Sequence, residues 1–253
     1  MNGRYYASIL PNHHIPAAGD AREIRKGYGA PPSRSYFKLR EAFARSRLLM
    51  DHSDDFYHQA IAVDLGASPG GWTQFLLEKG CRHVYAVDPG TLKLPKSLQM
   101  SGDSELLGKS GNLSRVSHIR GKISRCLGGL KVAMKRDNVA TIDILTCDIN
   151  AHPIQAIQSL LLLHPMLSSK AVIIATLKDF AGGGAEQRPG GGRKRGNGDG
   201  DDDGSNKDNV TSAGFETEVR MWLARLRRLA HRIEMFHLLT ATTWERTVVM
   251  ELR

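Results

Sequence analysis

The sequence is poor in cysteine, and this excludes two classes of site. Its 253 residues include three cysteines, Cys81, Cys126 and Cys147, which lie far apart and show no paired spacing. That pattern argues against a disulfide framework and against a cysteine-rich zinc site, and a reducing compartment is its simplest interpretation. The ten histidines also lack a pair with a spacing typical of metal ligands. We therefore expect no bound metal ion.

Long apolar segments are missing as well. A helix needs about 20 apolar residues to cross a bilayer, and no run in the sequence approaches that length. The N-terminus also lacks the apolar core of a secretory signal. We expect an intracellular, most simply cytoplasmic protein without a membrane partner, and an organelle or the nucleus stays open as its location.

Basic residues outnumber acidic ones. With 35 lysines and arginines against 26 aspartates and glutamates, the formal net charge is +9. This surplus favours polyanionic partners such as RNA, because contacts with phosphates release bound counterions. The same net charge is explained equally well if the basic residues serve only to keep the protein in solution.

Short apolar runs alternate with helical segments along the chain. This alternation indicates parallel βαβ units and therefore an α/β protein with a doubly wound, mostly parallel sheet. Two closing strands are expected to complete the sheet as an antiparallel pair. The strands are expected at 60–66, 82–88, 115–120, 142–147, 171–177, 235–239 and 247–252, and the helices at 70–79, 155–163 and 215–233.

Charged residues recur at the ends of the expected strands. Asp64, Asp88, Asp148 and Lys178 all lie at or near the carboxyl end of a strand. Doubly wound sheets bind their ligands at this edge. The repetition therefore indicates a site and not a scatter of surface charges.

The segment 181–213 differs from the rest of the chain. Gly, Asp and Asn dominate it and no apolar periodicity is visible, so we expect a disordered surface insertion. Its basic cluster at 193–195 could contact RNA, but a solvated insertion is the stronger interpretation. We expect an N-terminal extension at 1–30 and one domain at 31–253 that the insertion interrupts.

The most specific pattern is VDLGASPGGW, from Val63 to Trp72. Glycines follow a strand here and lead into a helix, so the backbone can approach a ligand and the first N–H groups of the helix can bind a carboxylate. Asp88, at the end of the next strand, is placed to accept both hydroxyls of a ribose. The turn is neither a P-loop nor a GxGxxG dinucleotide motif. Its alternative interpretation is a tight turn without a ligand.

This turn resembles motif I of the FtsJ-like RNA 2′-O-ribose methyltransferases, and four other segments extend the resemblance. PPSRSYFKLREAF at 31–43 is similar to the helix with the first catalytic lysine, and TCDIN at 146–150 to the strand end with the catalytic aspartate. TLKDF at 176–180 is similar to the second lysine segment, and WERTVVMELR at 244–253 to the late strand with the glutamate. The similarity is greatest to the bacterial branch that methylates a cytidine ribose of large-subunit ribosomal RNA.

The resemblance implies a Rossmann-like methyltransferase domain that binds S-adenosyl-L-methionine and acts on RNA, most simply ribosomal RNA. It implies a catalytic tetrad of Lys38, Asp148, Lys178 and Glu245. The bacterial branch has an N-terminal RNA-binding domain for which 1–30 is too short, so a protein or a ribosomal subunit could present the substrate. The implied contacts to the cofactor come from Ser35, Ser68, Pro69, Gly70, Gly71, Trp72, Asp88 and Asp148.

One position departs from the family. Its members often place an acidic residue against the adenine just after the third strand, where this sequence has HIRGK at 118–122. Either a backbone group binds the adenine here, or the matching position lies elsewhere. The departure supports the alternative of a catalytically inactive RNA-binding or scaffold protein that retains the fold. A methyltransferase for proteins or small molecules is a third hypothesis, although such sites usually lack two lysines beside the methyl group.

The four implied catalytic residues suit methyl transfer to a hydroxyl. Aligning the hydroxyl with the methyl group is worth up to roughly 7–11 kcal/mol, and a positioned base typically adds about 10²–10⁴-fold. Lys178 is the candidate that deprotonates the hydroxyl or stabilises its developing charge, and Asp148 and Glu245 would hold the amines. Taken singly, each has another interpretation, such as a helix-surface lysine for Lys38 or a turn former for Asp148.

Overall fold

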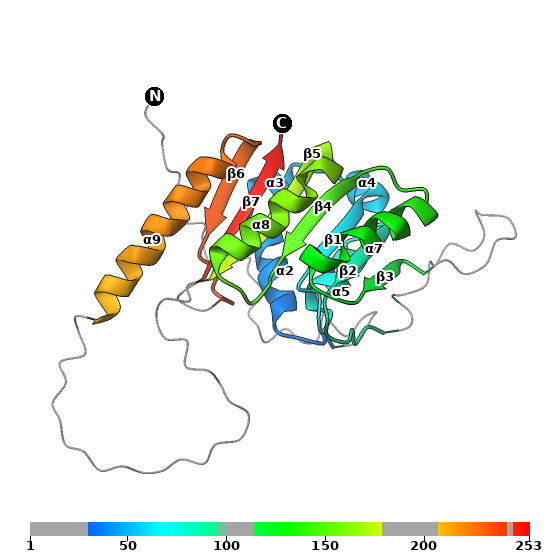
Figure 1. Cartoon of the computed structure of the whole chain (residues 1–253), viewed down its shortest axis with the longest axis horizontal. Coiled ribbons are helices and arrows are strands. Elements are labelled where there is room, and N and C mark those ends of the chain that lie inside the picture. Colours follow the sequence, from blue (N-terminus) through cyan, green and yellow to red (C-terminus); the bar gives the residue numbers. More distant parts are fainter. Residues whose placement is uncertain (1–29, 96–97, 99–113, 179–206, 242–244) are drawn as a thin grey trace, which may run out of the picture.

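The computed structural model describes residues 30–95, 98, 114–178, 207–241 and 245–253. In this part of the chain a seven-stranded sheet has the order β3-β2-β1-β4-β5-β7-β6 (Figure 1). The first five strands are parallel, whereas β7 is antiparallel to both β5 and β6. The strands are β1 Ile61–Leu65, β2 His83–Val87, β3 Val116–Ile119, β4 Ile142–Cys147, β5 Leu167–Lys178, β6 Ala230–Phe236 and β7 Glu245–Leu252.

Helices cover both faces of the sheet (Figure 1). Alternate residues of a central strand point to opposite faces, so Val63 of β1 packs in one apolar cluster and Ala62 in the other. Strands that are covered on both faces are buried along their length, which explains their continuous apolar runs. One face carries α7 Ile123–Arg136, α8 Pro153–Leu163 and α9 Lys207–Leu226, and the other carries α2 Ser35–Arg45, α3 Arg47–Met50, α4 Asp54–Gln59 and α5 Gly71–Glu78.

The predicted α/β sheet and the antiparallel pair of strands at its C-terminal end are confirmed. Each of the five parallel strands lies at a predicted position, although β3 is half-buried and not an apolar run, and β5 begins earlier than expected, at Leu167. The helices predicted at 70–79 and 155–163 are α5 and α8. Three helices, α3, α4 and α7, had not been predicted. In the described part of the chain, no helix combines the length and the apolar character needed to cross a bilayer.

Three predictions near the C-terminus are wrong in part. The helix expected at 215–233 ends at Leu226, and the strand expected at 235–239 is β6 at Ala230–Phe236 instead. The apolar spacing of the helix runs on into this segment, but its main chain hydrogen-bonds to β7, and that pairing decides the conformation. The insertion expected at 181–213 is also too long, because α9 begins at Lys207. Residues 181–206 of the predicted insertion and residues 1–29 of the extension predicted at 1–30 lie outside the described residues.

Candidate active site

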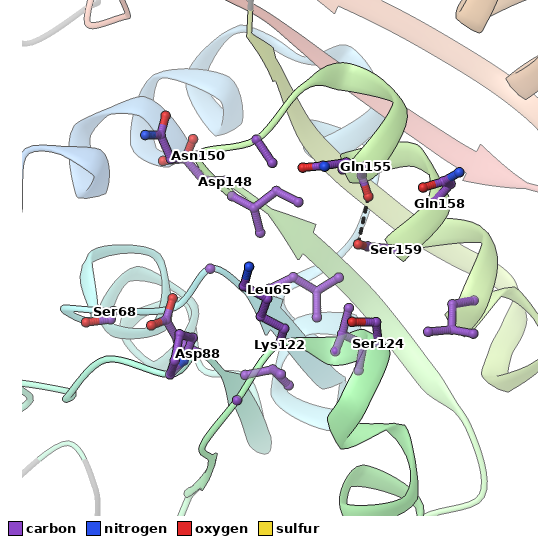
Figure 2. A pocket seen from close by; sticks show the side chains of 18 residues that line it. Leu65, Ser68, Asp88, Lys122, Ser124, Asp148, Asn150, Gln155, Gln158 and Ser159 are labelled. Atoms are coloured by element: carbon purple, nitrogen blue, oxygen red, sulfur yellow. Dashed lines mark hydrogen bonds between the residues drawn. The ribbon is translucent and has the colours of Figure 1, made fainter. Parts of the chain in front are cut away.

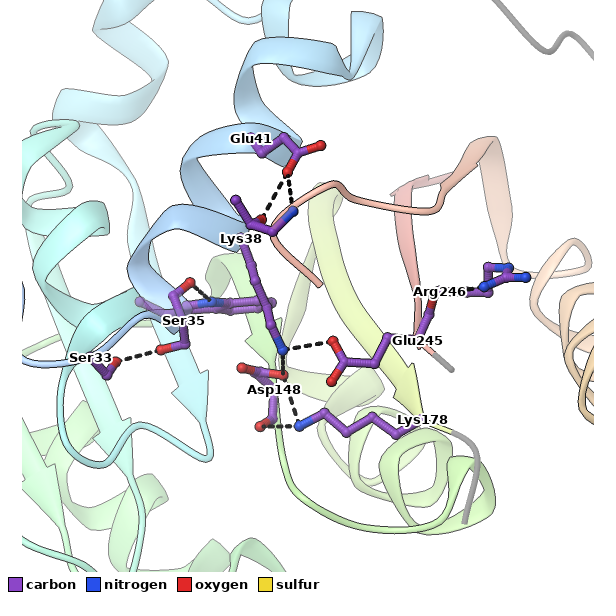
Figure 3. Close-up of polar contacts among 10 residues, drawn as sticks. Ser33, Ser35, Lys38, Glu41, Asp148, Lys178, Glu245 and Arg246 are labelled. Carbon is purple, nitrogen blue, oxygen red and sulfur yellow. Dashed lines mark hydrogen bonds and ion pairs between the residues drawn. The ribbon is translucent and has the colours of Figure 1, made fainter. Parts of the chain in front are cut away.

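Four charged side chains converge at the carboxyl edge of the parallel strands (Figure 3). The Nζ atom of Lys38 donates a hydrogen bond of 2.7 Å to Oε2 of Glu245 and lies 3.9 Å from Oδ1 of Asp148. The Nζ atom of Lys178 lies 3.0 Å from the same Oδ1 and donates to the main-chain carbonyl of Asp148 at 3.3 Å. Asp148 therefore lies between two amines. The structure brings together all four residues of the predicted tetrad.

The sheet and one helix place these side chains. Asp148 directly follows β4, and its N–H donates to the carbonyl of Leu65 at 3.1 Å. Lys178 is the last residue of β5 and Glu245 the first residue of β7. Lys38 lies in the first turn of α2. Side chains on strands and helices are held more precisely than side chains on loops, which suits a constellation that must keep its geometry.

The tetrad is nearly buried and its formal charges balance. Its side chains are 14%, 10%, 13% and 9% exposed for Lys38, Asp148, Lys178 and Glu245 respectively. Burying charges is unfavourable unless they pair, so removing one member would leave its partner uncompensated. Oδ1 of Asp148 pairs with the amine of Lys178 at 3.0 Å and lies 3.9 Å from the amine of Lys38. Asp148 thus sets a nearly buried carboxylate beside two amines.

A cavity of about 770 Å³ opens between the strand ends and the helices α7 and α8 (Figure 2). This volume falls in the range of small-molecule sites. Asp88 and Asp148 contribute the carboxylates among the described lining residues. The remaining wall is neutral apart from Lys122, and it comprises Leu65, Gly66, Ser68, Val87, Pro89, Gly121, Ile123, Ser124, Ile149, Asn150, Ala151, Gln155, Gln158, Ser159 and Leu162.

Three of the predicted cofactor contacts line this cavity, namely Ser68, Asp88 and Asp148. Gly66 lines it too, although it was not among the predicted contacts. It has a φ of +79°, and a Cβ there would lie 3.0 Å from the backbone of Ile149, so the close approach of the two strand ends requires glycine. The roles of all these residues toward a cofactor stay predictions.

The other predicted contacts are not among the residues that line the cavity. Trp72 is 2% exposed and packs in the apolar cluster beneath α2, and its indole N–H donates to the carbonyl of Ser35 at 2.7 Å. At Gly71 a Cβ would lie 2.3 Å from Oγ of Ser33 and 2.6 Å from Oγ of Ser35. Trp72 and Gly71 thus allow α2 to pack closely on α5. Ser35, Pro69, Gly70, Gly71 and Trp72 are not among the residues that line the cavity.

One buried carboxylate near the site had no predicted role. Asp64, in β1, is fully buried and accepts hydrogen bonds from Thr73 Oγ1 at 2.7 Å and from Thr146 Oγ1 at 2.8 Å. Burial raises the pKa of Asp64 to about 6, against the effect of the two hydroxyl donors. The carboxylate ties β1 to α5 and to β4 beneath the glycine-rich turn. Its place at a strand end was the available signal in the sequence.

The far end of the cavity is the region in which the sequence departs from the family pattern. Gly121, Lys122, Ile123 and Ser124 form its wall where β3 leads into α7. None of these four residues carries a carboxylate. Gln155 of α8 also lines the cavity. A ligand at this end would meet backbone groups, amides and hydroxyls, and one lysine.

Comparison with known proteins gives a family match and a fold match. The sequence model described as FtsJ-like methyltransferase matches residues 31–179. Among curated relatives, the ribosomal RNA large subunit methyltransferase M of Laribacter hongkongensis is 50% identical over 62 residues, which cover 24% of this chain and 17% of the relative. The protein of the same name from Aggregatibacter aphrophilus is 41% identical over 110 residues, covering 44% of this chain and 30% of the relative.

These matches span less than a third of the length of either relative. Among solved structures, one that its description assigns provisionally as a hemolysin of Streptococcus thermophilus has a TM-score of 0.53 and 17% identity. The similarity covers 90% of this chain and 69% of that one. At such low identity the similarity concerns the fold alone.

Proposed function

The chain belongs to the FtsJ-like methyltransferase family, and from this premise we propose that it transfers the methyl group of S-adenosyl-L-methionine to a ribose 2′-hydroxyl of RNA. One observation carries the proposal. Two lysines and two carboxylates from distant parts of the sequence lie within ion-pair distance of one another, and one of the carboxylates, Asp148, also lines a cavity of ligand size.

The residues of the cavity fit this cofactor. Asp88 directly follows β2 and lines the cavity, where a carboxylate can accept hydrogen bonds from the hydroxyls of a ribose. Asp148 also lines the cavity and brings a second carboxylate to it. Two carboxylates also suit a ligand that carries an ammonium and a sulfonium charge. When bound, S-adenosylmethionine supplies a methyl group that its sulfonium already activates.

The tetrad can prepare the hydroxyl. We assign Lys178 to the substrate hydroxyl: its amine holds the oxygen by a hydrogen bond and, in its uncharged form, would accept the hydroxyl proton as the oxygen takes the methyl group. Asp148 holds the amine of Lys178 in place at 3.0 Å, and Glu245 holds the amine of Lys38 at 2.7 Å. The near burial of all four keeps water from competing for the oxygen. The main contribution of this arrangement is the fixed orientation of the reacting oxygen.

RNA is the substrate class that the charge and the relatives support. A formal charge of +9 suits a polyanion, and the curated relatives carry the name ribosomal RNA large subunit methyltransferase M. We therefore propose ribosomal RNA of the large subunit as the substrate, inside the cell. A protein or a ribosomal subunit that presents this RNA is part of the same proposal.

The alternative of an inactive scaffold has less support. A scaffold needs the fold and a basic surface, but it has no need of four buried charges that meet at the cavity wall. Such a cluster is costly to bury, and charged groups gathered at a cavity wall in this way are typical of functional sites. Titration of the protein with S-adenosylmethionine in a calorimeter separates the two, since a scaffold would give no heat.

The proposal is tested by transfer of a labelled methyl group to total RNA and to isolated large ribosomal subunits. We expect label in RNA, and we expect mapping of the product to place the methyl group on a ribose 2′-oxygen. Label on a base, or on protein only, would point to a different reaction.

A further inference from the structure

Glu41 is a buried carboxylate with four hydrogen bonds and no assigned role. It lies on α2 one turn after Lys38 and is 3% exposed. Oε1 accepts from the N–H of Leu239 and from Nη1 of Arg45, both at 2.8 Å, while Oε2 accepts from the N–H and Oγ1 of Thr240 at 2.9 and 2.8 Å. Burial alone would raise the pKa of Glu41, but these hydrogen bonds lower it below its ordinary value.

These bonds tie α2 to the connection between β6 and β7. Leu239 and Thr240 belong to this connection, and Glu245 begins the strand that follows it. Arg45 adds a second link, because its Nη1 also donates to the carbonyl of His237 at 2.9 Å. The helix that carries one amine of the tetrad is thus fixed to the segment that precedes one of its carboxylates.

Lys38 lies between two anchors of α2 (Figure 3). Three residues before it, the carbonyl of Ser35 accepts from the indole of Trp72 at 2.7 Å. Three residues after it, Glu41 binds Leu239 and Thr240. A helix held at both positions can neither slide nor rotate freely on the sheet, so the reach of the Lys38 amine is fixed.

We propose, on the premise of the methyl transfer proposed above, that Glu41 is a positioning residue. It holds α2 where the amine of Lys38 lies 2.7 Å from Glu245 and 3.9 Å from Asp148. Glu41 does not line the cavity, so it acts through Lys38 and not on a ligand. Displacement of a catalytic group by about 1 Å can lower a rate by about 10²-fold.

The variant Glu41→Gln tests this role. Glutamine has nearly the same size as glutamate. Its amide NH₂ would face N–H or O–H groups that donate to the Glu41 carboxylate in the wild type, so these hydrogen bonds would be lost. We expect kcat to fall by on the order of 10²-fold, with the KM for S-adenosylmethionine unchanged because the cavity is not altered.

Glu234→Gln is the matched control. Glu234 of β6 is a partly buried carboxylate that links β6 to the start of α3. It accepts hydrogen bonds from Oγ of Ser46 at 2.5 Å and from the N–H of Leu48 at 3.3 Å. Its bonds hold the junction between α2 and α3, where Ser46 caps both helices, about two turns beyond Lys38. Both variants should be less stable than the wild type, and Glu234→Gln should keep its kcat.

A gentler variant and a structure complete the test. Thr240→Val removes one hydrogen bond to Glu41 without altering the carboxylate, and it should give a smaller fall in kcat even if Glu41→Gln does not fold. In a crystal structure of Glu41→Gln or Thr240→Val we expect the amine of Lys38 to have moved away from Glu245. An unchanged contact in that structure overturns the positioning role even if the wild type transfers no methyl group. Equal losses of kcat in the Glu41 and Glu234 variants also overturn it, and leave the proposed function standing.

Discussion

Lys178 and Glu245 lie directly opposite each other in the antiparallel ladder between β5 and β7. This pairing sets the last residue of β5 beside the first residue of β7, so the backbone of the sheet places both side chains. Asp148 follows the neighbouring strand β4 and reaches Lys178 at 3.0 Å. Three members of the tetrad are therefore fixed by strand pairing, whereas the fourth, Lys38, depends on the packing of α2.

The anchor at the start of α2 gives the first prediction. In Trp72→Phe most of the apolar volume remains, but the carbonyl of Ser35 loses its indole donor. The loss of one hydrogen bond typically costs about 0.5–1.5 kcal/mol, so we expect a loss of that size in the free energy of unfolding, measured by chemical denaturation. Methyl transfer should fall as well, because Lys38 follows Ser35 by one turn.

The control for this prediction is Trp222→Phe. Trp222 of α9 donates to Glu218 at 3.3 Å and packs against the apolar cluster on the face of the sheet opposite to α2. This variant should keep normal methyl transfer. Equal losses of transfer in the two tryptophan variants would contradict a specific role of Trp72 in placing α2.

Asp88 gives a prediction about affinity. In Asp88→Ala the ribose hydroxyls of the cofactor lose a charged acceptor, and hydrogen bonds to charged groups are worth about 1.5–3 kcal/mol. We expect the Kd for S-adenosylmethionine to rise by about 10- to 100-fold in calorimetry. The control is Asp143→Ala, which removes a carboxylate that accepts from the N–H of Ile61 at 3.0 Å, away from the cavity. Unchanged affinity in the Asp88 variant would place the cofactor elsewhere.

Asp64 predicts how stability depends on pH. Since burial raises its pKa to about 6, the folded chain keeps this proton at a pH at which the unfolded chain has lost it. The contribution of Asp64 to stability therefore increases as the pH falls from about 6 toward 4, and it is smallest above about 6.

The measurement compares the wild type with Asp64→Asn, in which this titration is absent. The difference in the free energy of unfolding, wild type minus variant, should grow in favour of the wild type by about 1 kcal/mol between about pH 7 and about pH 5. Groups common to both proteins cancel. A difference that stays constant over this range would show that the pKa of Asp64 is not raised.

Much of the fold follows from local patterns in the sequence. The parallel strands are short apolar runs because helices cover both faces of the sheet, and the charged residues that end β1, β4 and β5 mark the edge where ligands bind. The glycine-rich turn beside Asp64 is equally local. These features could be predicted because neighbouring residues determine them.

Features that depend on distant residues could not be predicted in this way. Ala230–Phe236 continues the apolar spacing of α9 but pairs with β7 as a strand, and only the partner strand decides between the two. The helix α7 contains Gly128 and Gly129, which weaken its helical signal. Glu41 has no local signature, since its partners Leu239 and Thr240 lie in the connection between β6 and β7. The family resemblance implied that Lys38 and Glu245 belong to one site. The periodicity of the sequence alone gives no reason to place these two residues together.

In the proposed reaction the tetrad promotes methyl transfer to a ribose 2′-oxygen. The most direct measurement is single-turnover transfer of labelled methyl from S-adenosylmethionine to large-subunit ribosomal RNA by the wild type and by Lys178→Ala, with cofactor affinity measured in parallel. We predict 2′-O-methylation by the wild type, a loss of about 10²-fold or more in the variant, and the same cofactor affinity in both. Transfer at the wild-type rate by Lys178→Ala would contradict the account.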